Sequence, residues 1–393
     1  IHLRWEHTGP RSWIRIVDGD RVELWQPFAP RLDGDAGERS VWKNLSATRL
    51  RFREVHPSGR LVFEHEWSSA ASLGLVRRVR LQATGEAVRV EVLDGVLNLV
   101  PPGVSVIHAS TMSCLADAYK WNELAAGGRL GLYTLYAKIW DRAEPKESFE
   151  ALVAWHAGLP PGGRALLSDA QVGAFCRSGS VEPEPLTRGR RGAFLVHFAG
   201  VADARGFVWH QVIDSPCSQV QAAELARRLD AGGGTPQEIR EAVAANTRGL
   251  DELLARADAF QQSADTMAAA HHRANVLFNI MRGGVFANGT RLDRDDLRAF
   301  IARRNRPLAE ALAPTIDAWP AQIERQDAIA AARAAGGERA ERLVLAYLPL
   351  TFSRRHGDPS RPWNRFSIRV RDAAGRRVIA YQGNWRDIFQ NWE

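Results

Sequence analysis

The sequence predicts a multidomain α+β protein: a large antiparallel β-sandwich, then a helical connector, then the start of an α-helical domain. The chain has 393 residues, more than the roughly 250–300 that one hydrophobic core usually holds. Short alternating strand patterns fill residues 1–215, and the hydrophobic period changes to that of helices afterwards. We therefore expect a sandwich at 1–215, a connector at 216–265 and a helical domain at 266–393.

The strand region shows recurring hairpin patterns. Residues 13–17 and 21–25 alternate in polarity around Asp18-Gly19-Asp20, which has turn chemistry. Two similar pairs follow, at 50–55 with 61–67 and at 76–81 with 88–93, so we predict three hairpins. Further strands are predicted at 131–135, 150–155, 194–198 and 207–212. So many short strands with one polar face are typical of two stacked antiparallel sheets.

Helical signals begin near residue 218. Residues 218–229 are amphipathic, and Thr235-Pro236-Gln237-Glu238 combines a capping box with proline at the first helical position. This signature predicts a helix running to about residue 259. Three more helices are expected: one containing Ala274, Leu277, Phe278 and Met281, one capped at 293–296 with Leu297, Phe300 and Ile301 inside, and one at 338–348.

Composition excludes several classes of protein. The net charge of +7 comes from arginines spread along the chain, without the basic run of a nucleic-acid site, so no nucleic-acid partner is expected. No apolar run reaches the ~18 residues of a membrane-spanning helix, so no membrane partner is expected either. Three cysteines without Cys-x-x-Cys spacing favour a reducing, cytoplasmic location. The adjacent His271-His272 cannot share one helix face, so we predict a helix surface and no metal site.

Two segments before the end of the chain are dense in polar and aromatic residues. Residues 117–123 (Asp-Ala-Tyr-Lys-Trp-Asn-Glu) are either a loop reaching toward a site or an edge loop of the sandwich. Residues 353–364 contain two prolines and a glycine, which forbid regular structure, together with Arg354, Arg355, His356, Trp363 and Asn364. This composition favours an ordered loop that lines a polar cleft.

The chain closes on Gly-Asn-Trp-Arg-Asp-Ile-Phe-Gln-Asn-Trp-Glu, residues 383–393. Carboxylates and amides bind sugar hydroxyls, and an indole covers the apolar face of a pyranose. Because the chain starts at Ile1 without methionine and stops within this helix-like motif, we expect a piece of a longer protein. The thirteen tryptophans against five tyrosines also suit stacking on sugars, although core positions account for most indoles.

The closing segment and the domain order together resemble the inverting glycoside phosphorylases related to cellobiose phosphorylase (glycoside hydrolase family 94 and its relatives). The resemblance implies an N-terminal sandwich joined to an (α/α)6 barrel, the six-hairpin toroid. Residues 385–391 are similar to the family's aromatic-Arg-Asp-x-x-Gln-Asp segment, with Asn391 replacing the final Asp. The segment 383–387 also fits, with two substitutions, the Gly-Asp-Trp-Asn-Asp segment whose last Asp is the general acid.

The position of Asp387, early in the helical domain, favours the first alignment. The resemblance then implies that Arg386, Asp387 and Gln390 hold the reacting sugar, with Trp385, Trp363 and Asn364 as further substrate contacts. Asp387 remains the minor candidate for the general acid, which is otherwise expected beyond Glu393. Arg354, Arg355 and His356 are candidate phosphate ligands.

The implied activity is inverting cleavage or phosphorolysis of β-linked glucosides or oligoglucans. No cofactor or metal is expected, and inorganic phosphate is a co-substrate if the enzyme is a phosphorylase. The expected partner is an oligosaccharide, and the sequence leaves a homodimer open. The alternative is a noncatalytic carbohydrate-binding or scaffold protein that uses the sandwich.

Overall fold

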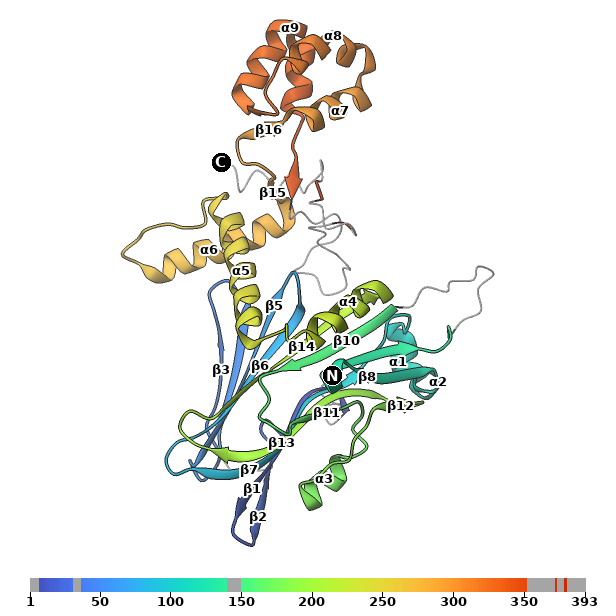
Figure 1. Ribbon diagram of the computed structural model, residues 1–393. Helices are drawn as coiled ribbons and strands as arrows, with labels where there is room; N and C mark the ends of the chain where they lie inside the picture. The colour runs from blue at the N-terminus through green and yellow to red at the C-terminus, as the bar shows by residue number, and fades with distance from the viewer. Residues whose placement is uncertain (1–6, 31–36, 140–149, 352–371, 373–377, 380–393) are drawn as a thin grey trace. The chain divides into compact units, whose positions relative to one another are not determined.

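The structure, a computed structural model, describes residues 7–30, 37–139, 150–351, 372 and 378–379. The chain divides into two compact units, residues 1–247 and 248–393. The first unit holds two large antiparallel sheets and the second is a helical region (Figure 1). The predicted order of a large sandwich followed by helices is confirmed, whereas the (α/α)6 barrel stays a prediction.

Among the described residues the first unit contains a nine-stranded and a five-stranded sheet. The larger sheet has the order β12 (Leu186–Arg188), β8 (Lys120–Ala125), β9 (Leu130–Leu135), β10 (Glu150–Ala157), β14 (Phe207–Ser218), β6 (Gly74–Ala83), β5 (Leu61–Ala70), β4 (Arg49–Val55), β3 (Arg39–Lys43). The smaller sheet has the order β11 (Arg164–Leu166), β13 (Gly192–Ala202), β7 (Val88–Leu99), β1 (Gly9–Asp18), β2 (Arg21–Trp25).

Two of the three predicted hairpins are confirmed. β1 pairs with β2 through Asp18 and Arg21 across a two-residue turn, and β4 pairs with β5. The third is wrong, because β6 and β7 belong to different sheets: β6 pairs with β5 and β14, and β7 with β1 and β13. Each of the two strands is paired on both sides within its own sheet, and the segment 84–87 carries the chain from one sheet to the other.

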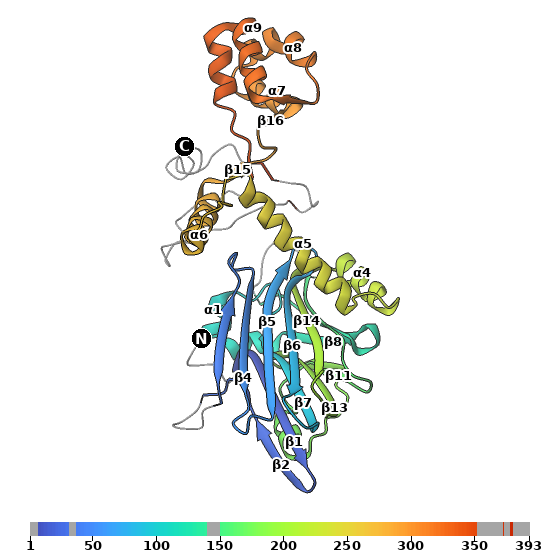
Figure 2. The same ribbon diagram turned by 90° about the vertical axis from the view of Figure 1, so that its left-hand side faces the viewer.

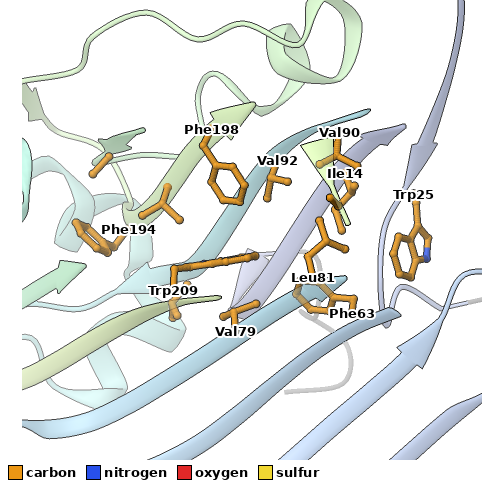
Figure 3. Packing of buried hydrophobic residues seen from close by; sticks show 14 of the residues in the cluster. Ile14, Trp25, Phe63, Val79, Leu81, Val90, Val92, Phe194, Phe198 and Trp209 are labelled. Carbon is orange, nitrogen blue, oxygen red and sulfur yellow. The ribbon is translucent and has the colours of Figure 1, made fainter. Parts of the chain in front are cut away.

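The core lies between the two sheets, where alternate residues of both meet (Figure 3). Phe63, Val79, Leu81 and Trp209 project from the larger sheet. They meet side chains of the smaller sheet that include Ile14, Val90, Val92 and Phe198. Phe198 and Trp209 make an edge-to-face contact with ring centroids 5.1 Å apart. This interdigitation of two inner faces is the packing expected of a sandwich.

A buried ion pair joins the sheets within this core. Arg77 of β6 donates two hydrogen bonds to Asp94 of β7, at 2.7 and 2.8 Å, and both side chains are fully buried. Asp94 also accepts hydrogen bonds from Trp209 Nε1 at 2.8 Å and from Ser12 Oγ at 2.6 Å. Gln211 Oε1 accepts from Arg77 at 2.8 Å. The Asp94 carboxylate therefore receives donors from both sheets.

Helices cover part of the outer face of the larger sheet. α4 (Gln219–Asp230) and the first part of α5 (Pro236–Ala255) lie against this sheet (Figure 2). Their residues Ala222, Leu229, Ile239 and Val243 form a second core with residues of β6, β10 and β14. Thr235 Oγ1 accepts a hydrogen bond from the Glu238 amide, which is one half of the predicted capping box. The Glu238 carboxylate accepts from the Gly234 amide instead of the Thr235 amide. The sequence pattern did not predict the short helices α1 (Val106–Thr111), α2 (Ser113–Ala118), α3 (Val172–Ser178).

The second unit contains four further helices among its described residues: α6 (Thr266–Gly283), α7 (Arg294–Arg304), α8 (Arg306–Asp317), α9 (Arg325–Leu345). Asp293 caps α7, whose Leu297, Phe300 and Ile301 are buried as predicted. α6 is confirmed as a helix, but its predicted apolar face is displaced, because Val276 and Ile280 are buried while Phe278 is 56% exposed.

The predicted helix at 338–348 is the second half of α9, which bends at Gly337. Two short strand pairs accompany the helices: β15 (Val285–Phe286) with β18 (Leu350–Thr351), and β16 (Arg291–Asp293) with β17 (Gln322–Glu324). Within the described residues, no helix combines the length and apolar character needed to cross a membrane.

Candidate functional site

The sugar and phosphate contacts expected from the sequence lie outside the described residues. They are Arg354, Arg355, His356, Trp363, Asn364, Trp385, Arg386, Asp387, Gln390. Their assignment therefore stays a prediction. The described chain offers a different candidate, in the sandwich unit.

A polar cavity of about 240 Å³ lies where β7 ends and β8 begins. We call it the Lys120 cavity. Its apolar wall comes from Val100, Val104, Ala109, Ala116, and its polar groups come from Thr8, Asn98, Ser113, Asp117, Lys120, Arg191. His7 also lines it. The cavity is therefore assembled from chain segments that are far apart in sequence.

Local sequence signals explain how these residues come together. Asn98 ends the regular part of β7 with a φ of +59°, a left-handed conformation that asparagine tolerates better than most residues. Its side-chain amide lies 3.4 Å from the Thr8 hydroxyl, to which it donates. Ser105 then caps α1 by accepting a hydrogen bond from the His108 amide. α1 and α2 follow directly and bring Ala109, Ser113 and Asp117 to the cavity.

Lys120 is the most buried charge of the cavity, with only 3% of its side chain exposed. Its ammonium group donates to Asp117 Oδ1 at 2.7 Å, and Asp117 is its one hydrogen-bond partner among the described residues. The backbone carbonyl of Lys120 accepts from the Gly189 amide at 3.0 Å. This bond ties β8 to the turn between β12 and β13, which also carries Arg191.

Two stacked tyrosines lie beside the cavity along the chain. Tyr119 is placed between the cavity residues Asp117 and Lys120, and its ring stacks on Tyr136 with centroids 5.3 Å apart and planes 7° from parallel. Tyr136 is 64% exposed, and its amide donates to the Tyr119 carbonyl at 3.1 Å. Neither tyrosine is among the residues that line the cavity, and the exposed ring of Tyr136 offers an aromatic face to the apolar side of a ligand.

The comparison with solved structures gives matches of low sequence identity and low TM-score. A bacterial glucoamylase in complex with acarbose is 12% identical, with a TM-score of 0.39, and the match covers 86% of this chain and 52% of that one. A putative kojibiose phosphorylase from the human microbiome is 7% identical, with a TM-score of 0.29, and the match covers 77% of this chain and 30% of that one. The inverting mannosidase BT2199 of family GH92 from Bacteroides thetaiotaomicron is 11% identical, with a TM-score of 0.29, and the match covers 61% of this chain and 27% of that one.

The chain therefore spans about half the length of the glucoamylase and less than a third of the other two proteins. No protein-family model and no curated protein matches the sequence.

The structure changes the interpretation of residues 117–123. The sequence offered two loop alternatives, but residues 120–123 form the start of β8 and Asp117 lies in α2. Asp117 and Lys120 nevertheless line the cavity, while Trp121 stacks under Arg188, whose guanidinium carbon lies 3.7 Å from the ring centroid. Lys120 and Trp121 are neighbours in β8, and their side chains lie on opposite faces of the sheet because successive strand residues point to opposite faces.

In the described part of the chain, no group of three histidine, cysteine, aspartate or glutamate residues is arranged to hold a metal ion. His271 is exposed on α6, as predicted for a helix-surface residue. His272 Nε2 lies 2.8 Å from the Asp258 carbonyl.

Proposed function

We propose that the chain is the N-terminal part of a carbohydrate-active enzyme that cleaves or phosphorolyses β-linked glucosides or oligoglucans with inversion. The observation that carries the proposal is the closing Trp385-Arg386-Asp387-x-x-Gln390 pattern, which follows a large sandwich and a helical region. This pattern combines an indole, a guanidinium, a carboxylate and an amide within six residues. Such a set binds both the apolar face and the hydroxyls of a sugar ring.

In the proposed reaction a general acid located beyond Glu393 protonates the leaving glycosidic oxygen. An oxygen of phosphate, or of an activated water in a hydrolase, attacks the anomeric carbon from the opposite face. The carbon–oxygen bond to the leaving sugar breaks, and the product has inverted configuration. Arg386, Asp387 and Gln390 hold the reacting sugar, and Arg354, Arg355 and His356 bind phosphate.

The full-length protein tests the reaction type. We expect β-glucoside cleavage in either case: a phosphorylase releases a sugar 1-phosphate and requires phosphate, whereas a hydrolase releases the free sugar without phosphate. In that protein D387N should lower kcat/KM about 10- to 100-fold, the cost of one charge-assisted hydrogen bond of ~1.5–3 kcal/mol. E393Q changes a carboxylate of the same segment and should leave kcat/KM unchanged. Equal losses in the two variants, or no glycoside turnover at all, would contradict the proposal.

A second candidate function is noncatalytic carbohydrate binding by the sandwich, and the tyrosine pair beside the Lys120 cavity favours it. In this case Y136A should weaken oligosaccharide binding to the chain about 10-fold, because the exposed ring that covers the sugar face is lost. W42A is the matched control, since Trp42 is 45% exposed on β3, at the opposite edge of the same sheet. Titration calorimetry measures both. Equal affinities for Y136A and wild type would exclude this role.

A further inference from the structure

We propose that the Lys120 cavity is a binding site for an oxyanion, the carboxylate or phosphate group of a small ligand. The glycosidic chemistry proposed above does not use this cavity, and its residues lie in the sandwich unit. The inference rests on the charges that line the cavity, on the ammonium hydrogens of Lys120 that have no acceptor among the described residues, and on the volume available.

The charged groups of the cavity leave a positive excess. Lys120 and Arg191 are cations, and among the described residues Asp117 is the one carboxylate that lines the cavity. The Asp117 ion pair compensates Lys120 alone, and no hydrogen bond or ion pair to Arg191 occurs among the described residues. A second negative group inside the cavity would complete the charge balance.

The donors of Lys120 point to the same conclusion. A lysine ammonium group has three hydrogens, and the single bond to Asp117 uses one of them. Burial of a charged group is unfavourable unless it is paired and hydrogen-bonded. With 3% exposure, Lys120 has little contact with bulk solvent, so the remaining hydrogens face the interior of the cavity or its contents. An oxyanion accepts such bonds with charge assistance.

Neutral donors complete the arrangement. The Asn98 amide and the hydroxyls of Thr8 and Ser113 line the same space as Lys120 and Arg191. A volume of about 240 Å³ is below the ~300–1,000 Å³ of sites for drug-sized ligands. Inorganic phosphate or a monosaccharide acid is therefore the appropriate size class. A neutral sugar would use the hydroxyl contacts but would leave the positive excess without a partner.

Titration calorimetry at low ionic strength tests the proposal with inorganic phosphate, D-glucuronate and D-glucose as probes. We expect one phosphate or one glucuronate to bind per chain, at least 10-fold more tightly than glucose, and more weakly as sodium chloride is raised. Tight binding of phosphate alone identifies a phosphate group as the ligand chemistry, and tight binding of glucuronate alone identifies a carboxylate.

Two variants with a matched control assign the binding to this cavity. R191A and K120M should each weaken anion binding at least 10-fold. R190A removes the neighbouring, exposed arginine and should leave the affinity unchanged. Arg191 is only half-buried, so R191A is informative even if K120M does not fold. Absence of saturable binding, equal affinities of R191A and R190A, or glucose binding as tight as glucuronate would each overturn the proposal. Glycosidase activity can be present or absent in any of these cases.

Discussion

Replacing Asp94 with alanine is expected to lower the free energy of unfolding of the sandwich by about 3–5 kcal/mol. The substitution leaves the Arg77 guanidinium fully buried without its carboxylate, and Trp209 Nε1 loses its acceptor. The guanidinium then keeps the desolvation penalty of burial without the attraction and hydrogen bonds that offset it. Hydrogen exchange of peptides from β7 and β14 measures the effect inside the sandwich, which matters in a chain of two compact units.

Two further variants distinguish the effect of breaking the buried ion pair from the effect of losing any negative charge. D18N removes the carboxylate that lies 3.4 Å from Arg60, in a pair whose side chains are 70% and 50% exposed, and exchange in the sandwich should stay unchanged within error. The double variant R77M/D94L replaces both charges with apolar groups and should recover part of the stability lost in D94A. If D94A behaves like D18N, the ion pair does not stabilise the contact between the sheets.

The sequence predicted individual strands well because their alternation depends on local burial. β2 and the α7 cap were predicted nearly to the residue, since a two-residue turn and an aspartate cap are local signals. The pairing of strands, in contrast, depends on the whole sheet. The wrong hairpin prediction for β6 and β7 shows this, because the turn residues at 84–86 are compatible with a hairpin and with a crossing between sheets. Only the partners available to each strand decide between them.

The Lys120 cavity was partly visible in the sequence. Asp117 and Lys120 fall in the polar and aromatic segment that the sequence singled out, and Arg191 belongs to a short arginine cluster. Thr8 and Asn98 gave no signal, because they reach the cavity only through the pairing of β1 with β7. A site built from residues around 8, 98, 120 and 191 depends on long-range contacts, and no local pattern in one sequence reports them.

Acidification is expected to destabilise the sandwich through two buried histidines. Burial lowers the pKa of His156 to about 4, with a further contribution from Arg129. Burial likewise lowers the pKa of His210 to about 4, assisted by Arg78 and Arg240. Neither ring nitrogen of His210 has a hydrogen-bond partner among the described residues, so the neutral ring is the form that the fold accommodates.

The sign of the pH dependence follows from these directions. In the unfolded chain both histidines titrate near 6.5, so between pH 6.5 and 4 the unfolded state binds protons that the folded state does not. Stability is therefore full above pH 6.5 and falls as the pH decreases toward 4. From pH 7 to pH 5 each histidine should cost about 2 kcal/mol, and the pair about 4 kcal/mol.

The variants H156Q and H210Q test this dependence, because glutamine is polar but does not titrate. Each should remove about 2 kcal/mol of the stability change between pH 7 and pH 5, whatever its effect at pH 7 itself. Denaturant unfolding at several pH values gives the slope, and limiting the range to pH 5 keeps most carboxylates ionised. If the double variant retained the wild-type slope, other groups would have to carry the acid sensitivity. Since neither side chain belongs to the Lys120 cavity, anion affinity at pH 7 should be the same in all three variants.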